Sequence, residues 1–220
     1  MSITDVSPTT QLKVDEPNLH FARLAPDQVV ARTAQALTER GMTAIVAETG
    51  EQAKAQALKL IPREAQVFTA QSMTTAHLGL VHELDETGHY RSVRKILKTM
   101  DRRSQMPEMR KIMSSQDIVV GSVQAITQDG IVLDASASGS QLPAYAAGAE
   151  KVIWIVGAQK IVKDIDEGLQ RIYQYCLPLE DERTRQVYGV GSGVNKILIV
   201  NREHTPGRIT VILVKENLGF

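Results

Sequence analysis

The chain has 220 residues, a length that fits one large domain, or one domain with a small appendage, without needing a disulfide or structural metal for stability. Aromatic residues make up only 4%, so Val, Ile, Leu and Ala must build the core. The 25 basic and 25 acidic residues cancel, which leaves no overall field to attract nucleic acid or a membrane surface.

Cysteine usage and the N-terminal residues predict the compartment. Cys176 is the only cysteine, which excludes an intrachain disulfide or a four-cysteine metal centre and suits a reducing environment. No apolar run approaches the roughly 20 residues that span a bilayer. The first residues, MSITDVSPTTQLKVDE, are too polar and acidic for a secretory signal. We expect a cytoplasmic protein without metal or cofactor, with a flexible arm over residues 1–23 and one domain over 24–220.

Helical and strand patterns alternate through the first half. Pro26 suits the first turn of a helix that Gly41 ends, and Ser72 is a candidate N-cap for a helix carrying Leu78, Val81 and Leu84. The expected segments are helices at 25–40, 51–61 and after Ser72, with strands at 43–47 and 66–70.

Residues 90–113 differ from the rest of the chain in charge. Apolar side chains keep a helical period there, beneath basic residues that face only Asp101 and Glu108. One interpretation is one or two solvated helices over the core; the other is a basic rim for an anionic ligand or acidic partner. The basic residues are Arg91, Arg94, Lys95, Lys98, Arg102, Arg103, Arg110 and Lys111.

The second half is richer in strands. Asp129-Gly130 is a tight-turn signal between β-type flanks, and the NREHTPG segment is interpreted as the long loop of a hairpin. Because several strands are continuously apolar and interleaved with helices, we predict an α/β fold whose mostly parallel sheet has helices on both faces. The expected segments are strands at 117–120, 126–133, 152–156, 196–200 and 208–214, and helices at 142–149 and 165–175.

Two polar segments follow strands of this predicted sheet, where α/β proteins bind ligands. The first, GSVQAITQDG, begins at Gly121, which lets backbone approach a ligand, and the second, ASASGSQLP, begins at Ala135 and precedes a helix whose N–H groups suit an anion. A turn and a helix cap explain the same residues. The candidate ligand-binding residues are Gly121, Ser122, Gln124, Thr127, Ser136, Ser138, Gly139, Ser140, Gln141 and Lys160.

Other motifs carry less information. The glycine-rich stretch at 188–196 precedes a strand, whereas a dinucleotide loop must follow one, so we interpret it as a loop or lid near the site. His77, His82 and His89 match no metal-binding spacing. Cys176 has no basic neighbour in sequence to activate it and is interpreted as a small hydrophobe at a helix end.

Residues 117–162 closely resemble the LUD (lactate-utilization) domain, as do LPLEDER at 177–183 and PGRITVILVKENLGF at 206–220. QSMTTAHLGL at 71–80 is similar to a serine- and threonine-bearing helix start of that family. The resemblance implies a fold similar to sugar-phosphate isomerases and CoA transferases. It also implies a role beside iron–sulfur partners that oxidise lactate to pyruvate.

The sequence departs from those enzymes in two respects. The AETG segment at 47–50 contains one glycine, whereas isomerases and CoA transferases of this fold have a glycine-rich loop there. No residue of the sequence matches the catalytic carboxylate of those enzymes. Three functions remain open. They are a subunit that binds a small carboxylate; an isomerase, hydrolase or acyl transferase using Glu48, Asp129 or Asp134; and a regulatory module that docks through 91–111. A homo-oligomer is compatible with each.

Overall fold

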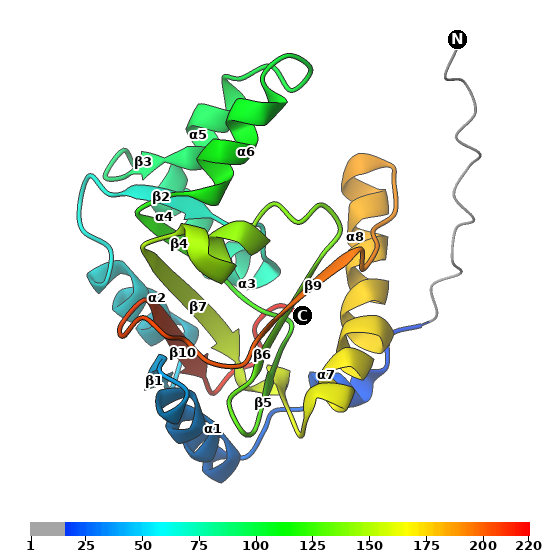
Figure 1. Ribbon diagram of the computed structural model, residues 1–220. Helices are drawn as coiled ribbons and strands as arrows, with labels where there is room; N and C mark the ends of the chain where they lie inside the picture. Colours follow the sequence, from blue (N-terminus) through cyan, green and yellow to red (C-terminus); the bar gives the residue numbers. More distant parts are fainter. Residues whose placement is uncertain (1–15) are drawn as a thin grey trace.

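The structure, a computed structural model, describes residues 16–220, and its main layer is a six-stranded parallel sheet (Figure 1). This confirms the predicted α/β fold with a mostly parallel sheet. In spatial order the strands are β1 (Thr43–Ala47), β10 (Ile209–Val214), β7 (Lys151–Gly157), β4 (Ile118–Gly121), β2 (Gln66–Thr69) and β3 (Arg91–Ser92).

Helices cover both faces of the main sheet because its central strands are apolar on both sides. On β7, Trp154 and Val156 join one core cluster while Ile153 and Ile155 join another. The first cluster includes side chains of α1 (Asp27–Glu39), α5 (Val93–Lys98) and α6 (Met106–Ser114). The second includes side chains of α2 (Gly50–Lys59) and α4 (Leu80–Asp85).

A second, four-stranded sheet lies beside the first and was not predicted as a separate layer. Its order is β8 (Ile161–Val162), β5 (Ala125–Thr127), β6 (Val132–Ser136) and β9 (Lys196–Val200). The antiparallel β5–β6 pair confirms the turn at Asp129-Gly130. The predicted hairpin between 196–200 and 208–214 is wrong, because β9 pairs with β6 whereas β10 lies between β1 and β7.

One long helical run packs on the second sheet through its first part, where Ile165, Leu169 and Ile172 join the core of that sheet. It comprises α7 (Ile165–Arg171), the π-turn η4 (Ile172–Cys176) and α8 (Leu177–Tyr188). Cys176 therefore lies inside a helical run, and its prediction as a helix-end residue is wrong. Pro178 did not end the helix because it occupies the first turn of α8, where a missing N–H is tolerated.

The helix predicted after Ser72 is divided into α3 (Met73–His77) and α4. The Ser72 side chain caps α3 by accepting a hydrogen bond from Thr74 N at 3.1 Å, as predicted. Gly79 then adopts φ +65°, a left-handed conformation that interrupts the helix before Leu80. The helix expected at 142–149 is the single π-turn η2 (Ala144–Gly148).

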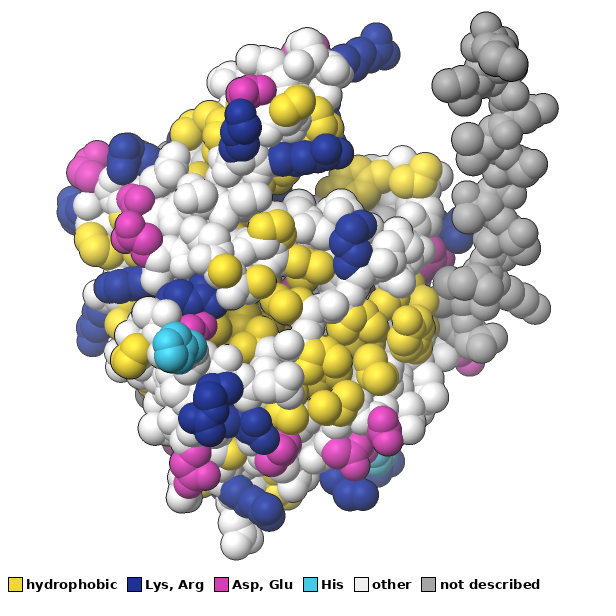
Figure 2. All heavy atoms as spheres, in the orientation of Figure 1, with side chains coloured by type: hydrophobic (Ala, Val, Ile, Leu, Met, Phe, Trp, Pro, Cys, Tyr) yellow, Lys and Arg dark blue, Asp and Glu magenta, His cyan; other side chains and the backbone are white. Residues whose placement is uncertain are grey.

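The structure describes residues 16–23 of the predicted arm and the whole basic stretch. Residues 1–15 of the arm lie outside the described residues, while η1 (Leu19–Ala22) rests on η4 through buried Phe21. The basic stretch forms β3, α5 and α6, and its side chains project from the top of Figure 2. No helix within residues 16–220 is long and apolar enough to cross a membrane.

Candidate functional site

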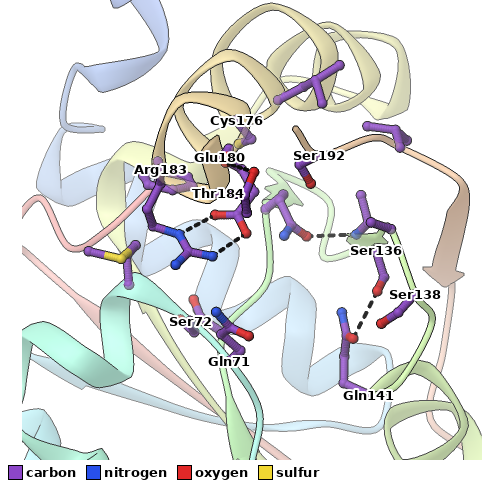
Figure 3. A pocket seen from close by; sticks show the side chains of 18 of the residues that line it. Gln71, Ser72, Ser136, Ser138, Gln141, Cys176, Glu180, Arg183, Thr184 and Ser192 are labelled. Atoms are coloured by element: carbon purple, nitrogen blue, oxygen red, sulfur yellow. Dashed lines mark hydrogen bonds and ion pairs between the residues drawn. The ribbon is translucent and has the colours of Figure 1, made fainter. Parts of the chain in front are cut away.

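A pocket of about 530 Å³ opens where the main sheet, the second sheet and α8 meet. Parallel strands bring their following segments to one edge, so the residues after β2, β4 and β7 line it together. Figure 3 shows Glu180 and Arg183 on one side of the cavity and Ser136, Ser138 and Gln141 on another.

Lys160 forms the deep polar end of this pocket. It closes the short turn η3 (Ala158–Lys160) after β7, and its side chain is only 1% exposed. Its Nζ donates hydrogen bonds of 3.1 Å to Thr74 Oγ1, Ser122 Oγ and the main-chain oxygen of Phe220. Within residues 16–220 no Asp or Glu side chain forms an ion pair with it. The amino group is therefore hydrogen-bonded but lacks a carboxylate counter-charge from a side chain.

The protein environment disfavours the charged form of this lysine. Burial lowers the pKa of Lys160 to about 7, and the positive charge of Arg171 adds to the effect, while Cys176 and Asp134 oppose it. Lys160 is therefore close to the midpoint between ammonium and neutral amine at neutral pH. Such a group can serve as an anion-binding cation or, after losing its proton, as a base or nucleophile.

Asp134 is a buried carboxyl group behind the serine-rich segment. It is 2% exposed and its Oδ2 accepts a 3.0 Å hydrogen bond from Gln141 Nε2. Gln141 Oε1 in turn accepts a hydrogen bond from Ser136 Oγ at 3.0 Å. Ser136 Oγ also accepts one from Gly139 N at 2.9 Å. Burial raises the pKa of Asp134 to about 7, against the opposing effects of Gln141 and the charge of Lys160. This chain of contacts holds Gln141 against the pocket wall.

Arg171 is a second buried cation without a carboxylate partner in the described chain. It is fully buried, and its Nη1 donates to the carbonyl oxygen of Gln124 and, at 2.9 Å, to Cys176 Sγ. Its Nη2 has no hydrogen-bond partner. The interpretation of Cys176 as a residue without a basic neighbour is therefore wrong, since one turn of helix brings Arg171 to it. Burial nevertheless raises the pKa of the thiol, so Cys176 remains protonated.

The rim of the pocket carries charges that are already paired. Arg183 makes two hydrogen bonds to the Glu180 carboxylate, at 2.6 and 2.8 Å, three residues before it on α8. Arg94, from the basic stretch, also lines the pocket and lies 3.9 Å from Asp85. The rim thus contributes little net charge, in contrast to the deep end.

The loop that follows α8 closes one side of the pocket. Its residues 190–194 line the cavity, as the sequence predicted for a loop or lid near the site. Asp181 holds this loop through a 2.8 Å hydrogen bond accepted from Ser192 N, and also accepts one from Arg185 Nε at 2.7 Å. The loop is therefore anchored to α8.

The sequence profile of the LUD domain matches residues 30–214, which is most of the chain. This chain belongs to the LUD-domain family. The match confirms the family resemblance and covers both sheets as well as every strand and helix that lines the pocket.

Comparison of folds finds a similar solved structure. The LUD-domain chain is similar to the crystal structure of a DUF162 family protein from Deinococcus radiodurans, with a TM-score of 0.54 and 13% sequence identity. The similarity covers 87% of this chain and 99% of the other, which at this identity establishes a shared fold. No curated protein matches the sequence.

The LUD domain brings most of the predicted ligand-binding residues to one pocket. Those that line it are Ser122, Gln124, Ser136, Ser138, Ser140, Gln141 and Lys160. Gly121, Thr127 and Gly139 do not. Gly121 lies directly behind the wall, where an added Cβ would be 1.9 Å from Tyr145 Oη, whereas Gly139 turns the serine-rich segment with φ +82°. Thr127 is buried at the β5–β6 turn and its hydroxyl donates to Asp129.

Sequence reasoning missed several groups around the pocket. Thr74 and Phe220 contact Lys160 from segments far away in the chain, and Arg171 comes from the second sheet's helix. Thr74 belongs to a segment that resembled the family, but nothing in its spacing linked it to Lys160. Within residues 16–220 no group of three His, Cys, Asp or Glu side chains is arranged to hold a metal ion.

Proposed function

We propose that this LUD-domain protein binds a small carboxylate such as lactate in the pocket, and acts with iron–sulfur redox partners in lactate oxidation. The observation that carries the proposal is Lys160, a buried amino group that no Asp or Glu of the described chain neutralises. Buried charges in proteins are normally paired, and an incoming carboxylate would add a charged partner to the two hydroxyls and the Phe220 oxygen that Lys160 contacts.

The neutral groups around Lys160 fit the same ligand. Ser122, Gln124 and Gln141 offer hydroxyl and amide donors to the oxygens of an anion, whereas the Ser136 hydroxyl already donates to Gln141. Arg171 adds positive potential from behind the wall. The redox partners are proposed from the family resemblance, because the single cysteine cannot ligate a cluster by itself.

Isothermal titration with lactate, pyruvate and longer carboxylic acids tests the binding proposal. Saturable heat at millimolar concentration or below is expected with at least one of them and not with a neutral amide of the same size. Absence of heat from every acid would overturn the proposal. Co-purification with cysteine-rich proteins encoded nearby tests the redox partnership separately.

A second function, that of an enzyme, is favoured by the electrostatic influence that Asp134 and Lys160 have on each other. Both are buried, both influence each other's charge, and both have pKa values near 7, as expected for groups that exchange protons at neutral pH. Glu48 and Asp129, the other candidate carboxylates, are exposed and pair with Lys215 and Arg40. Turnover of sugar phosphates or acyl-thioesters that is lost in Asp134→Asn would support an enzyme.

A further inference from the structure

Lys160 has the surroundings of a reactive amine as well as those of an anion-binding cation. Two of the three groups that contact its Nζ, Thr74 and Ser122, are hydroxyls, which both donate and accept hydrogen bonds. Thr74 already donates to the main-chain oxygen of Leu218 at 3.0 Å. Ser122 Oγ lies 3.3 Å from Thr74 Oγ1 and has, as a donor, only a 3.5 Å contact to the Val123 oxygen, so its proton can rotate toward the lysine at little cost.

This rotation lets the site keep its hydrogen bonds when Lys160 loses a proton. A neutral amine has two N–H groups and one lone pair. The two N–H groups can still donate to Thr74 Oγ1 and the Phe220 oxygen, while the lone pair accepts the Ser122 proton. Burial and the charge of Arg171, which lower the pKa of Lys160 to about 7, make that neutral form available at neutral pH.

The amine also borders the pocket rather than the closed core. Ser122, Lys160 and Phe220 all line the cavity, whereas Thr74 lies behind them and is completely buried. Ser122 is therefore the hydroxyl partner of Nζ that faces the cavity, which makes its side the one from which we expect a ligand to approach. Donors that suit a carboxylate, from Gln124 and Gln141, line the same cavity.

We propose that the ligand of this pocket is a 2-oxo acid and that Lys160 captures its carbonyl carbon as a Schiff base. This inference rests on the proposed carboxylate site and specifies the chemical class of its ligand. A 2-oxo acid places a carbonyl next to its carboxylate, so one compact ligand meets both the donors of the wall and the amine.

The reaction is balanced without any oxidant or reductant. The Nζ lone pair forms a bond to the carbonyl carbon as the C=O electron pair moves to oxygen, and one proton passes from nitrogen to that oxygen to give a neutral carbinolamine. A second proton then passes from nitrogen to the hydroxyl, the C–O bond breaks, water leaves and the nitrogen electron pair forms the C=N bond. Ser122 is the positioning residue for this step, since its hydroxyl can pass a proton between nitrogen and oxygen.

Reductive trapping of the full chain tests the inference. The protein is incubated with pyruvate and cyanoborohydride at pH 7.5, and the adduct is located by peptide mass mapping. We expect Lys160 to gain the mass of the acid less one oxygen atom, about tenfold more than the 80% exposed Lys163. Excess lactate, which has a carboxylate but no ketone, should suppress the adduct on Lys160 and leave that on Lys163 unchanged.

Two variants sharpen the test. Lys160→Arg keeps the charge and should abolish the specific adduct, whereas Lys163→Arg should leave it intact. Ser122→Ala should slow adduct formation several-fold even at saturating pyruvate, where the loss of its hydrogen bond to the anion no longer limits the rate. Heat of binding from pyruvate without an adduct on Lys160 would overturn the Schiff base and leave the carboxylate site standing. Absence of both heat and adduct would overturn the site as well.

Discussion

The two ends of the pocket contain cations that differ in burial and in ion pairing. At the rim, Arg183 is joined to Glu180 by two short hydrogen bonds and is partly exposed to water. At the deep end, Lys160 is almost completely buried and contacts two hydroxyls and a main-chain oxygen. A paired, solvated arginine is satisfied by its own chain, whereas a buried lysine without Asp or Glu is poised to gain from an added anion.

This difference predicts which end of the pocket contributes most of the binding energy. Charge at a rim attracts ligands but is screened by water and salt, while charge in a buried wall acts at full strength over a short distance. Residue type alone does not separate the two cases, since both side chains are cations that line the same pocket. The variants below test whether the two ends differ in the way that their surroundings predict.

The largest effect is expected from Lys160→Met. Losing a charge-assisted contact of about 1.5–3 kcal/mol should weaken carboxylate binding roughly tenfold to 150-fold. The free energy of unfolding should change little or rise, because an apolar chain of similar length replaces a buried charge. Titration calorimetry and urea unfolding measure the two quantities. Unchanged affinity in a folded variant would contradict the assignment of Lys160 as the anchor.

The next effect concerns the stability contribution of Asp134. Its pKa is about 7 in the folded protein and near 3.8 when unfolded, so the folded state binds the extra proton between these values. Wild-type stability should therefore fall as pH rises from about 4 to about 7. Asp134→Asn removes this loss and should be more stable than wild type by on the order of 2 kcal/mol at pH 8, but not at pH 4.

Chemical unfolding of both proteins across that pH range checks this expectation. Asp129→Asn is a suitable control, because Asp129 is 58% exposed and hydrogen bonds lower its pKa rather than raise it. A stability gain for Asp134→Asn that does not depend on pH would indicate a packing effect instead of a buried carboxyl group that resists ionisation.

Carboxylate affinity should also depend on pH. The lysine binds an anion as an ammonium, and its pKa of about 7 means that the charged form is lost as pH rises above that value. Affinity should then fall, approaching tenfold per pH unit, with a bound anion shifting the onset upward. Lys160→Arg stays charged over this range and should give a flatter profile. Repeating the titration in Asp134→Asn separates the contribution of the carboxyl group, which ionises in the same range.

The smallest effect is expected at the rim. Replacing both Arg183 and Glu180 by Gln removes a partly solvated ion pair whose contribution is about 1 kcal/mol or less. Carboxylate affinity should change by no more than about threefold. A loss comparable to that of Lys160→Met would show that the rim, and not the deep end, recognises the ligand.

Much of the framework was predictable from local patterns. The apolar runs that became β4 and β7, the Ser72 cap and the Asp129-Gly130 turn each follow from the preferences of a few adjacent residues. Seven of the ten predicted ligand-binding residues line the pocket, because segments that follow parallel strands meet at one edge of a sheet. Their role in binding stays a prediction.

The errors arose where long-range contacts decide. The segments at 196–200 and 209–214 are both apolar, and only their partners assign β9 to the second sheet and β10 to the first. Cys176 lies beside Arg171 because a π-turn continues the helix that the sequence pattern ended. Neither the partner of a strand nor the continuation of a helix is contained in the local sequence.

The sequence alone determined five of the six strands of the main sheet, the polar character of the turns after β4 and β6, and membership in the LUD-domain family. Only the tertiary structure decided that Lys160 is buried against Thr74, Ser122 and Phe220, and that Asp134 lies near enough to influence its charge. The physical reason is that secondary structure depends on neighbours within a few residues, whereas burial and pKa depend on groups that folding brings together from distant segments.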